Sequence, residues 1–290
     1  MVIVEWNSLS SLVVEAEKRR SRISDLVLGS YEDEDERRKA FKEMSRRLGI
    51  MKAAMHKGLN ERLCSRSGMV GGWGRVVETS RRERGAVAGD VFSRAVSAAL
   101  AVAEVNACMG KIVAAPTAGS CGVIPGVLIA LGEARGSSDE DLVMALFTAA
   151  AVGGVIAGRA TVAGAEGGCQ AECGSAAAMS AAAGVELCGG TPSQAAQAVA
   201  ISMKGSLGLV CDPVAGLVEV PCIKRNALSA ANAMAAIEMA IAGVESVIPA
   251  DEVIDAMKAV GRSLPESLRE TACGGLAVTP TAREIASRLA

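Results

Sequence analysis

Three cysteines in the second half of the chain, Cys169, Cys211 and Cys222, stand beside residues that interrupt regular structure. Two glycines precede the first, an Asp-Pro pair follows the second, and a proline precedes the third. Glycine and proline impose special backbone angles, so these positions are expected at loop ends and helix starts. Backbone N–H groups at a helix start stabilise a thiolate, which is the form of cysteine that binds metals. The three thiols are therefore candidate metal ligands.

Spacing alone leaves the kind of site open. Zinc sites often use close cysteine pairs, whereas iron–sulfur clusters also take cysteines at scattered positions. Cys173 lies four residues after Cys169 and could share a helix face with it, which would supply a fourth thiol for a closed structural site. Buried cysteines without any metal are the alternative, because free cysteine is among the most buried residue types.

A second break in the pattern has small side chains and many free backbone N–H groups, and it contains Pro116, Thr117, Ala118, Gly119 and Ser120. Such a loop at a helix start can receive a carboxylate, although a plain connection between two helices gives the same pattern. His56 is the single histidine of the chain. It follows a predicted helix, between Lys52 and Lys57, where a solvated side chain is expected. It is therefore either structural or the one imidazole able to act as a base.

Composition favours helices and excludes several functions. Half of the 290 residues are hydrophobic but only 2% are aromatic, so alanine, valine, leucine, isoleucine and methionine must build the core. The net charge of −2 gives no basic excess for nucleic acid or a membrane surface. The N-terminus lacks the pattern of a signal peptide, and nine cysteines suit a reducing, cytoplasmic compartment. The apolar run from Leu142 to Gly158 predicts a buried core helix rather than a membrane span.

The elements divide into two predicted parts. Residues 1–84 form a charged helical arm with a glycine-rich loop, and its first 60 residues predict a pair of amphipathic helices that pack on a neighbour or dock another chain. Residues 85–290 predict one compact all-α domain, because no alternating strand pattern occurs there. Helix starts are predicted from capping boxes at Ser137–Glu140 and Thr191–Gln194, and at Asp251. The last of these helices is expected to stop at Gly261.

Three segments together resemble a known family: Gly-Gly-Cys169-Gln-Ala-Glu, Ala115-Pro-Thr-Ala-Gly-Ser120, and the stretch from Cys211 through Pro-Cys222-Ile-Lys-Arg-Asn226. They are similar to the alpha chain of the two-chain, iron–sulfur-dependent L-serine dehydratases, and the similarity runs over nearly the whole sequence. The resemblance implies a helical catalytic region and a [4Fe–4S] cluster on Cys169, Cys211 and Cys222. It also implies that one iron lacks a protein thiolate and acts as a Lewis acid on the serine hydroxyl.

The implied reaction converts L-serine to pyruvate and ammonia without pyridoxal phosphate, as a step of amino-acid degradation and gluconeogenesis. The resemblance places a beta chain with a Ser-Ser-His-Thr motif beside this one, so we expect a hetero-oligomer, a base supplied in trans, and little activity of this chain alone. We also hypothesise that the serine carboxylate and ammonium are received by the 116–120 loop with Lys224, Arg225 and Asn226, with Arg225 the better fork if it points inward. Lys224 and Arg225 facing solvent is the alternative.

Two departures and two alternatives accompany this interpretation. Cys173 is an extra thiol, either a structural neighbour or a cap on the open iron, and Val70 stands where the family pattern has threonine. A cluster-dependent L-cysteine desulfidase is the nearest other enzyme. A non-catalytic helical protein with a structural metal site, or with none, is the alternative from a different class.

Overall fold

The computed structural model describes residues 6–289, and the N-terminal residues used to argue against a signal peptide lie partly outside this range. The helices are α1 (Leu9–Arg19), α2 (Ile23–Gly29), α3 (Glu34–Asn60), α4 (Trp73–Arg84), α5 (Asp90–Ala107), α6 (Val123–Arg135), α7 (Asp139–Arg159), α8 (Gly164–Gly167), α9 (Ser175–Leu187), α10 (Pro192–Lys204), α11 (Cys222–Ile241), α12 (Ala250–Ser263) and α13 (Pro280–Leu289). Residues 6–289 contain no β-strand, and only one isolated bridge joins two extended residues. The predicted all-α fold is confirmed.

Helix α9 forms the centre of the molecule and packs against α6, α7, α10 and α11. Its residues from Ser175 to Val185 are all buried, and most are alanine, serine or glycine. These small residues let neighbouring helices approach closely: a Cβ added at Gly184 would lie 2.3 Å from the Ile237 side chain on α11. Because aromatic residues are scarce, close contact between small side chains replaces bulk in filling the core.

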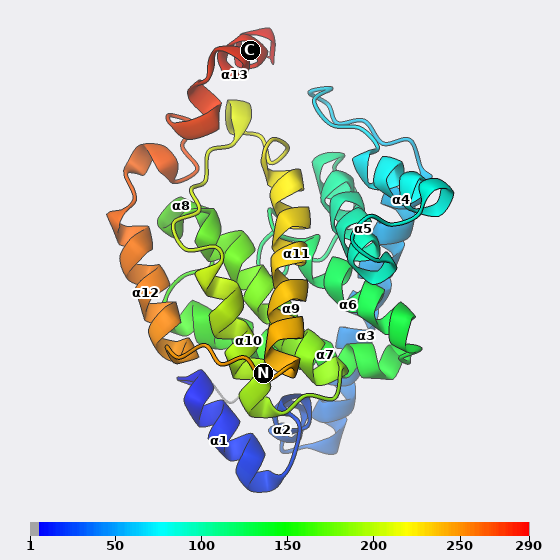
Figure 1. Cartoon of the computed structure of the whole chain (residues 1–290), viewed down its shortest axis with the longest axis vertical. Coiled ribbons are helices and arrows are strands. Elements are labelled where there is room, and N and C mark those ends of the chain that lie inside the picture. The colour runs from blue at the N-terminus through cyan, green and yellow to red at the C-terminus, as the bar shows by residue number, and fades with distance from the viewer. Residues whose placement is uncertain (1–5, 290) are drawn as a thin grey trace.

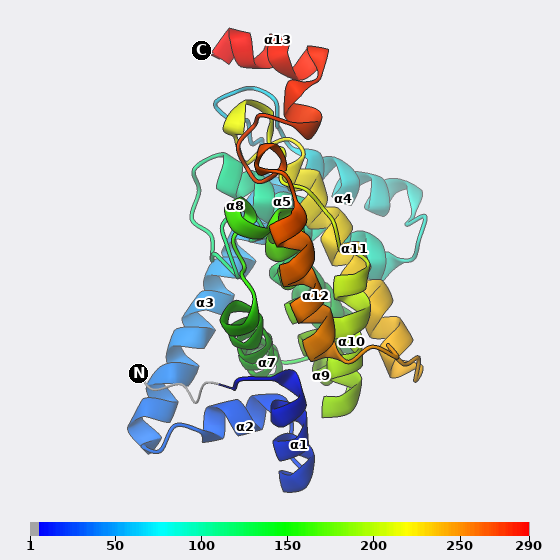
Figure 2. The same cartoon turned by 90° about the vertical axis from the view of Figure 1, so that its left-hand side faces the viewer.

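The remaining helices surround this centre along the long axis of the molecule. Figure 1 shows α11 crossing the front, with α12 along one side and α4 and α5 along the other. Figures 1 and 2 both place α13 at one end and α1 and α2 at the opposite end. Helix α7 has the length and composition of a membrane span, but 61% of its apolar window is buried. It packs on α2, α3 and α9, so the prediction of a core helix is confirmed.

The charged N-terminal segment contains three helices before residue 60, so the predicted pair was wrong in number. The apolar face of α1 joins the main core, and Asp251 of α12 accepts hydrogen bonds from the backbone N–H groups of Leu9 (2.8 Å) and Ser10 (3.0 Å) at the start of α1. A carboxylate at a helix N-terminus is favoured by the helix dipole. His56 lies exposed within α3, not after it. The division of the chain at residue 84 stays a prediction.

The helix boundaries confirm one predicted cap and correct two predicted boundaries. Thr191 and Gln194 form the predicted capping box of α10, which ends at Lys204 with Gly205 as its C-cap. The cap of α7 is one residue later than predicted, at Ser138 with Asp141, because the N–H of the preceding serine bonds back to α6. Helix α12 continues past Gly261 to Ser263 and stops before a proline, which disfavours helical angles in the residue preceding it.

Candidate functional site

All three predicted cysteine ligands are buried, and two of them, Cys169 and Cys211, lie close together. Cys169, Cys173 and Cys211 pack as one buried group, and their exposed fractions are 1%, 0% and 2%. Cys222 begins α11 and is 6% exposed. The Sγ atoms of Cys169 and Cys211 and a carboxylate oxygen of Glu172 all lie within 4.8 Å of one another. All four thiols are free, so the region is a buried, thiol-rich centre.

The motif around Cys169 explains how this thiol is held. Gly168 has a φ of 74°, and a side chain there would meet the carbonyl oxygen of Leu209 at 2.9 Å, so only glycine suits the position. The Gln170 side chain accepts a hydrogen bond from the N–H of Gly208 (2.9 Å) and donates one to the carbonyl of Met257 on α12 (3.1 Å). A π-helical turn, Gln170–Gly174, then carries Cys173 back toward Cys169. Gln170 therefore links the segment that contains Cys169 to the loop at Gly208 and to α12.

Asn226 joins the start of α11 to the loop that contains residues 116–120. Its Nδ2 donates to the carbonyls of Gly119 (2.6 Å) and Cys222 (3.0 Å), and its Oδ1 accepts from the N–H of Gly122 (2.9 Å). The side chain is 1% exposed, so these bonds replace all contact with water. Asn226 thus brings two segments about a hundred residues apart in the chain to the same place.

Arg225 points inward, toward the thiols. Its guanidinium forms an ion pair with Asp212 (2.8 Å) and donates to the carbonyl of Val210 (2.8 Å). Its positive charge also acts on the Cys169 sulfur. Hydrogen bonds from Cys173 and Cys211, and next the Arg225 guanidinium, lower the pKa of Cys169 well below its usual value despite its burial. The Arg225 guanidinium therefore favours the thiolate form of Cys169, which is the form that binds a metal.

The other thiols are protonated in the metal-free chain. Their hydrogen bonds to the Cys169 sulfur, together with burial, raise the pKa values of Cys173 and Cys211. Burial raises the pKa of Cys222 to about 12. Binding of a metal centre would therefore release protons from this group.

Glu172 is a site residue that the sequence analysis quoted within a motif but gave no role. Its carboxylate accepts a hydrogen bond from the Thr117 hydroxyl, which in turn lies 3.0 Å from the Ser120 hydroxyl. A Cβ at Gly119 would lie 2.6 Å from Glu172 Oε1, so the loop needs glycine to approach the carboxylate. Burial, and then the charges of Cys169 and Glu270, raise the pKa of Glu172 to about 7. The sequence signal that could have marked Glu172 as a site residue was its position three residues after Cys169.

Glu270 is the second carboxylate at the centre, and no local pattern marks it. A Cβ built on Gly164 would lie 3.2 Å from Glu270 Oε2, 3.3 Å from the Cys211 sulfur and 3.3 Å from Glu172 Oε2. Three acidic or thiol groups from distant segments therefore meet around one glycine. Only the folded chain brings Glu270 to this position.

Among the remaining predicted site residues, some lie beside Glu172 and others point away from the thiols. Thr117 and Ser120 face Glu172, whereas Ala118 is exposed and its carbonyl accepts from Asn106 (3.1 Å). Pro116 lies at the start of the same loop and is partly buried. The Lys224 ammonium lies 3.6 Å from the centroid of the Trp73 ring, a cation–π contact. The structure thus brings Arg225 and Asn226, but not the Lys224 ammonium, into contact with the cysteine segments.

The glycine-rich loop at 67–72 is fastened to the segment between Cys211 and Cys222. Ser65 donates to the Glu219 carboxylate at 2.7 Å, and Ser67 donates to the same oxygen. Val70 is 1% exposed and packs with the Trp73 and Ile223 side chains. In this chain the loop is therefore anchored by two serines and one buried glutamate, with an apolar residue at position 70.

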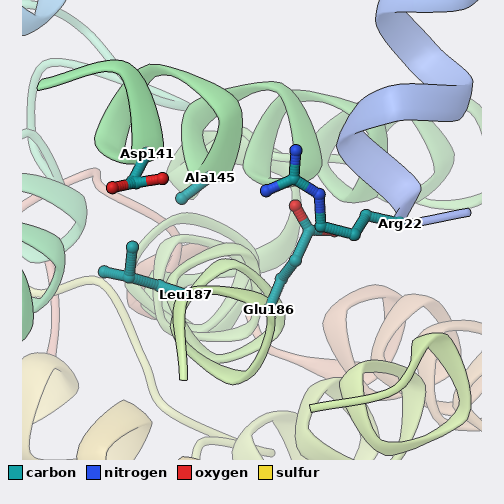
Figure 3. Close-up of a pocket in the computed structure, with 5 residues that line it drawn as sticks. All are labelled: Arg22, Asp141, Ala145, Glu186 and Leu187. Atoms are coloured by element: carbon teal, nitrogen blue, oxygen red, sulfur yellow. The ribbon is translucent and has the colours of Figure 1, made fainter. Parts of the chain in front are cut away.

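A small cavity of about 50 Å³ lies away from the thiols, between the start of α2 and helices α7 and α9. Figure 3 shows the Arg22 guanidinium reaching toward Glu186, with Asp141 farther along the cavity wall. A water molecule takes up about 30 Å³ in the liquid, so this space suits one or two waters. The Oε1 atom of Glu186 has no hydrogen-bond partner among residues 6–289, which a bound water would provide.

Comparison with known proteins identifies the family. A sequence model of the family described as serine dehydratase alpha chain matches residues 7–277. The chain is 48% identical over 286 residues to the probable L-serine dehydratase alpha chain of Bacillus subtilis, covering 98% of this chain and 95% of that protein. It is 43% identical over 284 residues to the L-serine dehydratase alpha chain of Peptoniphilus asaccharolyticus, covering 96% of each. The chain therefore belongs to the serine dehydratase alpha chain family, as the resemblance predicted.

A longer relative is matched over part of its length. The L-serine dehydratase of Streptomyces coelicolor is 38% identical over 281 residues, which cover 93% of this chain but 57% of that protein. In that relative the matched region is therefore one part of a larger polypeptide.

Proposed function

We propose that this protein is the alpha chain of an L-serine dehydratase, which deaminates L-serine to pyruvate and ammonia. The observation that carries the proposal is the buried group of thiols beside Arg225 and Glu172, in a chain of this family. The proposed cofactor is a [4Fe–4S] cluster held by Cys169, Cys211 and Cys222. The clustered thiols require reducing conditions, so we place the protein in the cytoplasm.

The donor set fits such a cluster. Iron–sulfur clusters are held by thiolates, and the three proposed ligands are buried and free, with Cys169 and Cys211 packed together. Arg225 supplies a positive charge beside the Cys169 sulfur, and local charge is one of the features that tune bound clusters. Cys173 belongs to the same packed group. We propose it as a neighbour of the cluster rather than a ligand, because the three-cysteine pattern of the resemblance does not require it. When bound, the cluster would supply a Lewis-acidic iron for the hydroxyl group that leaves.

The loop at 116–120 is the proposed site for the substrate carboxylate. Among residues 6–289, the backbone N–H groups of Thr117, Ala118, Gly119 and Ser120 find no hydrogen-bond acceptor. Consecutive free N–H groups form an anion-binding concavity. Asn226 holds this loop against the first turn of α11, so the carboxylate would lie beside the thiols. Arg225 already pairs with Asp212, and its proposed role is to neutralise thiolate charge.

Removal of the Cα proton requires a base, and we propose that the beta chain supplies it. His56 is exposed on α3, and nothing in its surroundings connects it to the thiols. The relatives named as alpha chains, and the larger Streptomyces coelicolor protein, support a second component. We further propose that the N-terminal helices contribute to the surface that binds it. Within this chain, Glu172 is the carboxylate positioned beside the 116–120 loop that could hold a proton at Oε2.

The ligand assignment is tested by anaerobic reconstitution of cysteine-to-serine variants. Cys169→Ser, Cys211→Ser and Cys222→Ser are each expected to lose most iron and acid-labile sulfide, whereas Cys173→Ser keeps them. Cys273→Ser is the matched control, because that cysteine is exposed. Loss of iron in Cys173→Ser with retention in Cys211→Ser would contradict the assignment.

The activity is tested by following pyruvate release from L-serine under anaerobic conditions, with and without the beta chain. We expect little turnover by the cluster-loaded alpha chain alone and full turnover when the partner is added. Replacing L-serine by L-cysteine and measuring sulfide distinguishes a desulfidase. If the lone chain turns over L-serine at the full rate and Glu172→Gln abolishes this, the base lies in this chain and not in the partner.

A further inference from the structure

A cavity of about 290 Å³ lies on the outer side of the cysteine segment, where α8 and the end of α7 meet α12. Figure 2 shows α12 and α8 side by side on this face. Its lining includes Thr161, Glu166, Met257, Lys258, Arg262 and Arg269. Neither the predicted cluster ligands nor any residue of the 116–120 loop lines it. The cavity is therefore separate from the proposed substrate site.

Three of the lining side chains are cationic and one is anionic, so the cavity has a net charge of +2. Lys258 already donates to the carbonyl of Arg159 at 2.6 Å. Within residues 6–289, neither Arg262 nor Arg269 has a carboxylate within ion-pair distance. An anion bound in the cavity would therefore pair with guanidinium groups that no protein carboxylate in this range neutralises.

The size of the cavity limits what it can hold. A volume of 290 Å³ corresponds to roughly ten water molecules and lies at the lower end of the range for ligand pockets. The lining also contains Met257 and three alanines, which suit a few carbon atoms. An organic acid of a few carbon atoms therefore fits better than a nucleotide or a peptide.

The cavity is connected to two of the predicted cluster ligands through the backbone. The residues on either side of Arg269 pair with Cys211: the Cys211 N–H donates to the carbonyl of Leu268 (2.9 Å), and the N–H of Glu270 donates to the carbonyl of Cys211 (2.8 Å). Met257, in the cavity wall, accepts the hydrogen bond from Gln170, the residue after Cys169. An occupant held by Arg269 would therefore contact the segments that position both thiols.

We propose that this cavity is a second binding site for a small carboxylate anion, such as a 2-oxo acid. The carboxylate forms a charge-assisted pair with the guanidinium groups of Arg262 and Arg269. Met257 and the alanines contact its carbon atoms. Glu166 lowers the affinity by repulsion and receives no hydrogen bond from the ligand. The inference goes beyond the proposed function, because it does not depend on catalysis.

The test is calorimetric titration of the full-length chain with pyruvate, before and after cluster reconstitution. Arg262→Gln and Arg269→Gln are each expected to weaken binding at least tenfold, because each loses a charge-assisted hydrogen bond. Arg269→Lys, which keeps the charge, should retain part of the affinity. Arg283→Gln on α13 is the matched control, because this arginine is exposed and has no ion pair within residues 6–289. Circular dichroism checks that each variant is folded.

Glu166→Gln distinguishes the two kinds of small carboxylate. A ligand without an ammonium group should bind this variant about two- to threefold more tightly, since one repulsion is removed. A zwitterion such as L-serine, if it used Glu166 for its ammonium group, would bind the variant more weakly. The proposal is overturned if pyruvate does not bind saturably at tens of millimolar, if its affinity is unchanged in both arginine variants, or if Glu166→Gln weakens it.

Discussion

Replacing Arg225 by methionine should destabilise the metal-free chain strongly, because it leaves a buried carboxylate without its partner. The Arg225 and Asp212 side chains are only 12% and 3% exposed, and their charged atoms lie 2.8 Å apart. Methionine fills much of the volume of the arginine stem but offers neither the ion pair nor the hydrogen bond to Val210. Asp212 would keep only its bond from the N–H of Leu276, at 2.7 Å.

The magnitude follows from these contacts. Removing one partner of a buried ion pair costs about 3–5 kcal/mol. Because Asp212 keeps one backbone donor, we expect about 3 kcal/mol for Arg225→Met. Asp212→Asn should cost less, about 1–2 kcal/mol, since Arg225 retains the Val210 carbonyl. The double variant buries no unpaired carboxylate, so its loss should fall short of the sum by about 1–2 kcal/mol, a coupling typical of residues in contact.

Urea unfolding followed by circular dichroism measures these free energies, with the slope m checked for constancy across the variants. Arg288→Met is the matched control, because Arg288 and its partner Glu284 are 66% and 69% exposed. An exposed pair of this kind contributes about 0–1 kcal/mol. If Arg225→Met loses no more stability than Arg288→Met, or if the two single losses simply add, the pair does not stabilise the centre as described here.

Three further outcomes are expected from thermal and denaturant unfolding. Gly58→Ala should cost about 1–3 kcal/mol, because its Cβ would lie 2.3 Å from a backbone oxygen of α5, whereas Gly154→Ala, with no atom within 4 Å, should gain about 0.5–1 kcal/mol; equal effects would contradict the packing. Burial alone would raise the Glu78 pKa, but the Arg81 hydrogen bond and other neighbouring charges hold it at about 2. The stabilisation from ionised Glu78 is therefore fully present above the unfolded-state pKa of 4.5 and is lost as the pH falls toward 2. The difference in unfolding free energy between wild type and Glu78→Gln should shrink over that interval, and a constant difference would refute this. Asn226→Ala should cost about 2–3 kcal/mol, since it leaves buried backbone groups unpaired, and a loss below 1 kcal/mol would show that the loop is held by other contacts.

The helices and the family could be predicted from the sequence because their signals are local. Apolar residues repeat at helical spacing, and the cap at Thr191 is set by side chains three residues apart. The scarcity of aromatic residues predicted a core built from alanine and larger aliphatic side chains, and the alanine-rich, buried α9 agrees with this. The cap of α7 was misplaced by one residue, because the end of one helix decides where the next can begin.

The surroundings of the thiols were decided only by tertiary structure. Arg225 and Lys224 are neighbours on one helix, yet Arg225 pairs with Asp212 beside the thiols while Lys224 stacks on Trp73. Successive residues of a helix point about 100° apart, so packing against other helices decides which of them meets the centre. Glu270 reaches Cys211 through pairing between segments almost sixty residues apart. Local signals were therefore enough to predict the helices and the candidate thiol ligands, whereas long-range packing sets which charged side chains surround those thiols.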